Sequence, residues 1–200
     1  MSYLWHLLIY LGVYTIVAVS LNLIVGYCGL LSLAHAGFFA VGGYVYALAT
    51  LSLKWGFAAA ALLAILIAVV LSLMVSIPAW RFKGNFFVLV SLAVQALLFG
   101  ALYNWYADAP VGTWQNLTNG TFGLSGIPKP ILLGWQFQQA SSIVVLTWFV
   151  TLLCVGISWL LLTSPWGRLL RSLRDDELVT RGLGKNTRWL KTQAFAIACG

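Results

Sequence analysis

The sequence predicts an all-α fold, a polytopic bundle of transmembrane helices with five full spans and the start of a sixth. Hydrophobic residues make up 62% of the chain and charged residues only 8%, whereas soluble domains carry about 25% charged residues. Five apolar runs approach the roughly 20 residues that one helical crossing needs. Seven of the eleven Lys and Arg residues fall in one short stretch between two apolar runs. Residues 1–200 are therefore expected to form a single membrane domain.

The apolar runs give the predicted spans in order. They are Leu4–Gly26, Leu30–Leu53, Trp55–Ile77, Phe86–Tyr106 and Ile143–Leu162. No basic segment precedes the first run, so it is predicted to be a retained span and not a cleaved signal peptide. The third run is expected to stop at Pro78 and the fifth at Ser164-Pro165, because proline cannot continue a helix normally.

A sixth run begins near Gln193 and reaches the last residue, Gly200. Its apolar part, Ala194 to Gly200, is about a third of one crossing. A helix that stopped inside the bilayer would leave carbonyl groups unsatisfied, at several kcal/mol each. We therefore expect the sequence to be truncated, or the next part to lie on another chain. The alternative is a short helix that lies on the membrane surface.

The basic residues predict the orientation, because Lys and Arg near span ends stay on the cytoplasmic side. Residues 163–191 are expected to form a cytoplasmic loop and residues 103–142 an extracytoplasmic loop. Within the latter, Asn119–Pro130 is dense in Gly and Pro and favours turns over a helix. The side of the N-terminus depends on whether Gly26–Leu53 crosses fully or is re-entrant.

The segment GYCGLLSLAHAGFFAVGGY, Gly26 to Tyr44, is unusually rich in small residues. The spacing of Ser32, Ala36 and Ala40 predicts one helical face, which Gly43 extends, and small residues allow close helix packing. Polar groups within apolar runs are costly and are candidates for function; they are Asn22, His35 and Gln95. Both ordinary helix packing and a role in lining a solute pathway remain open for these residues.

The basic stretch carries the signals of two short helices. Ser164-Pro165 is typical of a helix start, and a basic helix is expected from Trp166 to about Arg174. Asp175 and Asp176 can cap a second helix, where acids suit the positive end of the helix dipole. Its expected features are a Glu177–Arg181 pair four residues apart, an apolar face and a left-handed end at Gly184. That face comprises Leu178, Gly182 and Leu183.

A short helix with an apolar face has two possible partners. It can rest on lipid headgroups, or it can insert into a groove on a soluble protein. The acidic cluster favours a protein partner, because anionic lipid would repel it.

Composition and spacing exclude several other classes. The basic residues flank spans and do not form a nucleic-acid-binding face. Cys28, Cys154 and Cys199 lie in apolar runs without the spacing of a metal site, so no metal and no cofactor is expected. His6 and His35 are isolated, and no nucleophile–base pair is recognisable, which argues against a membrane enzyme. No Asp or Glu lies deep in any apolar run, although an ion-coupled transporter needs such groups.

Two segments together resemble permease subunits of branched-chain amino acid ABC importers. They are the glycine-rich segment Gly26–Tyr44 and the basic stretch Pro165–Lys191, which resembles the cytoplasmic coupling loop of that family. Arg81–Gln95 and the Asn119–Pro130 loop are also similar to the family pattern. The similarity extends in order over nearly all 200 residues.

The resemblance implies a non-catalytic permease in a bacterial inner membrane. It implies pairing with a second permease subunit, two cytosolic ATPase subunits and an extracytoplasmic solute-binding protein. In this reading Asp175–Gly184 is the coupling helix, seated in a groove of the ATPase. Family members continue for several spans beyond the end of this chain. Permeases for urea and short-chain amides share much of the pattern and remain an alternative.

Overall fold

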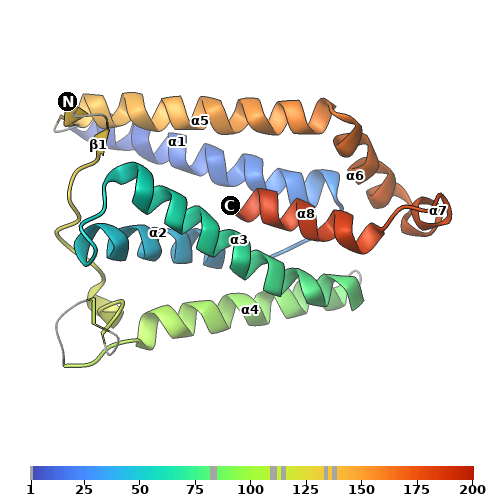
Figure 1. Cartoon of the computed structure of the whole chain (residues 1–200), viewed down its shortest axis with the longest axis horizontal. Helices are drawn as coiled ribbons and strands as arrows, with labels where there is room; N and C mark the ends of the chain where they lie inside the picture. Colours follow the sequence, from blue (N-terminus) through green and yellow to red (C-terminus); the bar gives the residue numbers. More distant parts are fainter. Residues whose placement is uncertain (1, 82–84, 109–111, 114–115, 133–134, 137–138) are drawn as a thin grey trace. The chain divides into compact units, whose positions relative to one another are not determined.

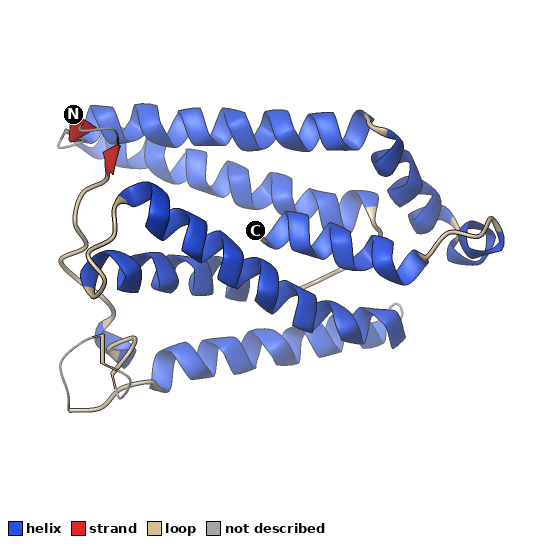
Figure 2. Ribbon diagram, viewed as in Figure 1, coloured by secondary structure: helices blue, strands red, loops and turns tan. Residues whose placement is uncertain are grey.

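The computed structural model describes residues 2–81, 85–108, 112–113, 116–132, 135–136 and 139–200. Over these residues the chain is mostly helical, with one pair of two-residue strands (Figures 1 and 2). The α-helices are α1 Ser2–Asn22, α2 His35–Leu51, α3 Phe57–Arg81, α4 Asn85–Asn104, α5 Ala140–Thr163, α6 Pro165–Asp175, α7 Glu177–Gly182 and α8 Thr187–Cys199. The π-helical turn η1, Leu23–Tyr27, continues α1, and the 3₁₀ turn η2 is Gly120–Phe122. The strands β1, Ile131–Leu132, and β2, Trp135–Gln136, pair antiparallel.

The first of two compact units comprises residues 1–31 and 137–198. In it α1 packs along α5, and α6 and α7 follow α5 in the chain (Figure 1). Gly12 of α1 lies where the helices touch, since an added β-carbon would be 2.8 Å from Thr147 Cγ2. The Thr151 hydroxyl donates a 3.3 Å hydrogen bond to the Gly12 carbonyl. Small residues and hydroxyl hydrogen bonds of this kind join helices within membranes.

The second unit comprises residues 32–136 and 199–200. In it α2 packs against α3 and α4, and α3 also contacts α4. Ala34, Phe38 and Val75 form a buried apolar cluster, against which Leu71 and Val94 pack. Asn119–Pro130 contains η2 and three glycines with positive φ, which confirms the expectation of turns in this segment.

Among the described residues, four helical segments are long and apolar enough to cross a membrane. They are Tyr3–Tyr27, Phe57–Pro78, Phe86–Asn104 and Ala140–Thr163. All four correspond to predicted spans, and all four expose large apolar side chains such as Leu66 and Leu152. This surface suits contact with lipid or with other membrane helices.

The predicted second span, Leu30–Leu53, is not confirmed as a full crossing. Its helix α2 has 17 residues, which corresponds to about 25 Å, against an apolar bilayer core of roughly 30 Å. The residues from Cys28 to Ala34 are not helical. Ser32 therefore precedes the helix, and the expected helical face of Ser32, Ala36 and Ala40 does not form.

Two predicted helix boundaries were wrong. The third span does not stop at Pro78, because α3 continues to Arg81. The proline removes one hydrogen bond, to the carbonyl four residues earlier, and membrane helices tolerate this loss where neighbouring groups satisfy the freed carbonyl. The final helix begins at Thr187 and not near Gln193. Asn186 Oδ1 accepts a 3.2 Å hydrogen bond from the Trp189 N–H, a capping interaction that starts α8 inside the polar stretch.

Candidate coupling surface and pathway residues

The corner between α5 and α6 depends on a close backbone approach. Ser164 precedes α6 and Pro165 is its first residue, as predicted. The Ser164 hydroxyl does not cap α6, however, because it donates a 2.5 Å hydrogen bond to the Leu161 carbonyl of α5. An added β-carbon at Gly167 would lie 2.6 Å from the backbone carbonyl carbon of Leu162. The corner therefore requires glycine at this position.

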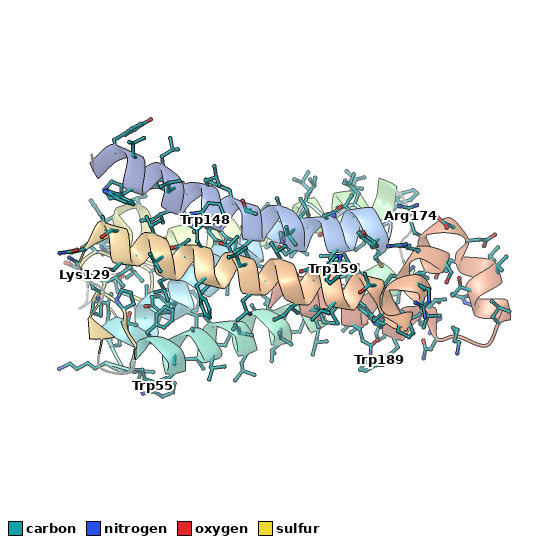
Figure 3. All side chains as sticks on the ribbon, turned by 90° about the horizontal axis from the view of Figure 1, so that it is seen from above. Trp55, Lys129, Trp148, Trp159, Arg174 and Trp189 are labelled. Atoms are coloured by element: carbon teal, nitrogen blue, oxygen red, sulfur yellow. The ribbon has the colours of Figure 1, made fainter. Side chains whose placement is uncertain are left out.

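Helix α6 is amphipathic and rests on the end of α1 through two arginines. Its buried face comprises Gly167, Leu170 and Leu173. The guanidinium of Arg171 lies 5.0 Å from the centre of the Tyr27 ring, a cation–π distance. Arg174 Nη1 donates a 2.7 Å hydrogen bond to the Gly26 carbonyl, and Figure 3 shows Arg174 where α6 meets the end of α1.

The π-turn gives Arg174 its acceptor. In a π-turn the N–H donates to the carbonyl five residues earlier instead of four. Here the Cys28 N–H donates to the Leu23 carbonyl in this way. Gly29 follows with φ +73° and ends the helical run. An added β-carbon at Gly29 would lie 2.6 Å from Arg174 Cγ, so glycine is required both for the conformation and for the close approach of Arg174. A positive side chain at a helix C-terminus is also favoured by the helix dipole.

Helix α7 is capped by hydrogen bonds at both ends. Asp176 Oδ1 accepts from the N–H groups of Leu178 at 2.7 Å and Val179 at 3.1 Å. At the other end Gly184 has φ +76° and donates to the Arg181 carbonyl. The Lys185 N–H donates to the Thr180 carbonyl, which completes a Schellman motif. The predicted acidic cap and glycine end are both confirmed, with Asp176 as the capping residue.

Three large apolar side chains of this capped loop point into solvent. Leu178, Val179 and Leu183 are 71%, 61% and 73% exposed; we call these residues the α7 apolar surface. Gly182 and Gly184 are exposed beside them. Thr180 is buried, with 2% exposure, and its hydroxyl donates to the Asp176 carbonyl at 2.8 Å. One side of α7 is therefore packed within the protein, and the other presents apolar side chains that remain largely exposed among the described residues.

The acidic residues of the loop have separate surroundings. Asp175 pairs with its neighbour Arg174 at 3.3 Å, and both side chains are more than half exposed. Glu177 and Arg181 form the predicted pair, at 3.3 Å. Glu177 is nevertheless largely buried, because the same carboxylate oxygen lies 3.1 Å from Lys191 Nζ. Glu177 thus faces the protein and not the α7 apolar surface.

The second unit brings several of the predicted polar residues together. The Leu33 N–H donates a 3.0 Å hydrogen bond to Ser91 Oγ, which lies inside the candidate span Phe86–Asn104. One turn further along α4, Gln95 Oε1 would lie 2.7 Å from a β-carbon at Gly37. Helix α2 therefore starts beside the interior of a membrane span. Non-helical backbone at this depth must be buried in protein or line a cavity.

Two buried polar atoms in this region have no hydrogen-bond partner among the described residues. They are Ser32 Oγ and Gln95 Oε1. His35 is buried at the first position of α2, and its Nδ1 lies 4.0 Å from Cys199 Sγ. An unsatisfied polar atom in an apolar interior is costly. The arrangement can accept hydrogen bonds from a polar group that reaches it.

The remaining predicted membrane residues do not join this cluster. Ala36 and Gly43 are exposed and Ala40 is half-buried. A β-carbon at Gly43 would have no neighbour within 4 Å. Asn22, in the first unit, ends α1, where its side chain contacts Gly26. Among the described residues, no group of three or more His, Cys, Asp or Glu could hold a metal ion.

The whole chain matches one protein family. The sequence model described as "Branched-chain amino acid transport system / permease component" matches residues 3–199. The chain belongs to this family. With four apolar helices of spanning length among the described residues, family membership supports a multi-pass membrane protein.

Curated relatives share this family. The high-affinity branched-chain amino acid transport system permease protein LivM of Escherichia coli K12 is 31% identical over 93% of this chain and 47% of the relative. LivM of Salmonella typhimurium LT2 is 30% identical with the same coverage, and a probable LivM of Methanocaldococcus jannaschii is 27% identical over 96% of this chain and 62% of the relative. The chain thus spans about half the length of the bacterial relatives. No solved structure gives a significant match.

Sequence reasoning missed three residues of the coupling region. Lys191 was counted only among the basic residues of the cytoplasmic loop, and the structure buries it against Glu177. Arg171 and Arg174 were treated only as basic residues that set orientation, although they join α6 to the end of α1. The signal in the sequence for these contacts was Gly29. A glycine shortly after a span can adopt a positive φ and allows another element to approach closely.

Proposed function

We propose that this chain forms part of the translocation pathway of an ATP-binding-cassette importer for branched-chain amino acids in a bacterial inner membrane. The family match over residues 3–199 carries the proposal. Two relatives at 30–31% identity are named as permeases of high-affinity branched-chain amino acid transport systems. ATP hydrolysis belongs to a separate subunit in this proposal.

The proposed partners are a second permease subunit, two cytosolic ATPase subunits and an extracytoplasmic solute-binding protein. The proposed topology places residues 163–191 in the cytosol and residues 103–142 outside. The α7 apolar surface supports an ATPase contact, because neighbouring exposed apolar side chains rimmed by polar residues mark sites of contact with a protein or a membrane. Asp175 and Arg181, both more than half exposed, lie at its rim.

In the proposed mechanism the ATPase moves α7 when it binds and hydrolyses nucleotide. The capping bonds of Asp176 and Gly184 keep α7 a rigid body during this motion. Helix α6 follows, and the contacts of Arg171 with Tyr27 and of Arg174 with Gly26 carry the displacement to the end of α1. Bistable packed elements can convert such small shifts into a change of access to the pathway.

Ser32, His35 and Gln95 are the residues that we propose for the solute pathway. Ser32 Oγ and Gln95 Oε1 are buried and unsatisfied among the described residues, and unsatisfied groups of this kind call for a functional explanation. Discontinuous helices that begin within the membrane also recur at transporter binding sites. An ion-coupled mechanism has less support, because all four acidic residues lie outside the four candidate spans.

The function can be tested by uptake in vesicles that contain the full protein with its partner subunits. We expect accumulation of labelled leucine that requires ATP and an intact ATPase site, with competition by isoleucine and valine but not by urea. Competition by urea or acetamide alone would reassign the solute class. Uptake that follows a proton or sodium gradient without ATP would contradict the proposal.

Replacing Gln95 by leucine is expected to reduce transport without reducing the stability of the protein. Removal of a buried, unsatisfied amide oxygen should leave the thermal unfolding temperature unchanged or higher, because burying such an atom without a partner costs about 1–3 kcal/mol. Leucine uptake should fall by about threefold to tenfold, which corresponds to the loss of one hydrogen bond. The matched control is Ser91→Ala, which deprives the Leu33 N–H of its acceptor and should lower stability. Normal uptake by the Gln95→Leu variant would show that Gln95 does not contribute to the solute pathway.

A further inference from the structure

The Glu177 carboxylate connects α7 to α8. One carboxylate oxygen lies 3.1 Å from Lys191 Nζ and 3.3 Å from Arg181 Nη2. It also accepts a 3.3 Å hydrogen bond from the Thr187 hydroxyl. Lys191 and Thr187 both belong to α8, whereas Arg181 belongs to α7. Two of these three contacts therefore cross from one helix to the other.

The connection is buried, which distinguishes it from an ordinary surface ion pair. The side chains of Lys191 and Glu177 are 5% and 15% exposed. A surface pair contributes little to stability, but the loss of one partner from a buried pair leaves an uncompensated charge and is strongly destabilising. If the carboxylate turned towards a cytosolic partner, Lys191 would remain buried as an uncompensated charge.

The pair also lies within electrostatic range of the end of the first span. Cys28 directly follows the span Tyr3–Tyr27. Burial raises the pKa of its thiol to about 12, and Lys191 lowers and Glu177 raises that pKa by smaller amounts. The ion pair is therefore close enough to Cys28 to act on its thiol electrostatically.

We propose that Glu177 is a positioning residue that acts through Lys191 and transmits the displacement of α7 to α8. It is not a contact to the ATPase, which meets the α7 apolar surface on the other side. The inference rests on the proposed function, since the displacement is the one that the ATPase imposes. The contacts of Glu177 with Lys191 and Thr187 support this mechanical link between α7 and α8.

The test uses the double variant Glu177→Gln/Lys191→Met in the assembled transporter. Neutralising both partners leaves no buried unpaired charge, so the protein should fold and retain its ATPase subunits. Leucine uptake per ATP hydrolysed should fall by about tenfold, within the usual range of coupling between sites. The matched control Arg188→Gln removes an exposed cation of α8 but leaves the Glu177–Lys191 pair, and it should retain coupling within about twofold. Lys191→Arg should also retain coupling, because it keeps the charge.

A labelling experiment tests the link without transport. Thr180 is buried, so a Thr180→Cys variant should react slowly with maleimide. Reaction should become several-fold faster when Glu177→Gln/Lys191→Met is added and should not change with Arg188→Gln. Normal coupling in the double variant, or unchanged labelling, would overturn the inference. So would loss of the ATPase subunits from Glu177→Gln but not from Lys191→Met, because Glu177 would then be a direct ATPase contact. Absence of ATP-driven uptake in the unmodified transporter would instead refute the proposed function and leave the labelling result to decide on the link.

Discussion

Replacing both Leu178 and Leu183 by aspartate is expected to abolish ATP-driven uptake in a chain that still folds. The two side chains are 71% and 73% exposed, and substitutions at such positions usually change stability by less than about 0.5 kcal/mol. Each anchor lost from the centre of an interface costs about 2 kcal/mol or more. The ATPase subunits should therefore dissociate during purification of the complex.

The measurement is the amount of ATPase that co-purifies with the tagged permease, together with the thermal unfolding temperature. Arg188→Asp serves as a control, because Arg188 is exposed on α8 and lies outside the α7 apolar surface. It should retain the ATPase. A Leu178→Asp/Leu183→Asp variant that keeps normal amounts of ATPase and normal uptake would show that the ATPase binds elsewhere.

The Gly167→Ala variant is expected to lose about 3 kcal/mol of stability, the upper end of the range for overpacked sites. The new β-carbon would lie 2.6 Å from backbone atoms of Leu162. Backbone atoms cannot move aside as the end of a flexible side chain can, so the corner between α5 and α6 must open. For a chain of this size, the thermal unfolding temperature should fall by roughly 6–12 °C.

Gly156→Ala is the matched control for this variant. Gly156 lies in α5, and a β-carbon there would have no neighbour within 4 Å. Alanine has the higher helix propensity, so the control should be neutral or slightly stabilising. Equal unfolding temperatures for Gly167→Ala and the unmodified protein would contradict the close approach of α6 to Leu162.

Local signals made part of the fold predictable from the sequence. Helix α7 was predicted because its cap, its i,i+4 pair and its left-handed glycine all lie within ten residues of one another. Apolar length alone identified the four spanning segments. Signals of this kind depend on residues close in sequence and require no knowledge of tertiary packing.

Features that depend on distant residues were not predictable. The interruption before α2 is stabilised by Ser91, which is 58 residues from its partner Leu33. The burial of Lys191 depends on Glu177 from the preceding helix. The junction of α6 with α1 joins Arg174 to a carbonyl 148 residues away. His35 and Gln95 were found as polar exceptions in apolar runs and Ser32 through the spacing of small residues, but only the structure places Gln95 beside Gly37.

The central claim is that the loop carrying α7 lies in the cytosol, and cysteine labelling in oriented vesicles tests it most directly. Lys129 and Lys185 are both exposed and are separated along the chain by one candidate span, α5 (Figure 3 labels Lys129). Native Cys28 gives little background, because its raised pKa keeps the thiol protonated. An impermeant maleimide should label Lys185→Cys only in inside-out vesicles and Lys129→Cys only in right-side-out vesicles. Labelling of Lys185→Cys in right-side-out vesicles would contradict the topology and the proposed contact with a cytosolic ATPase.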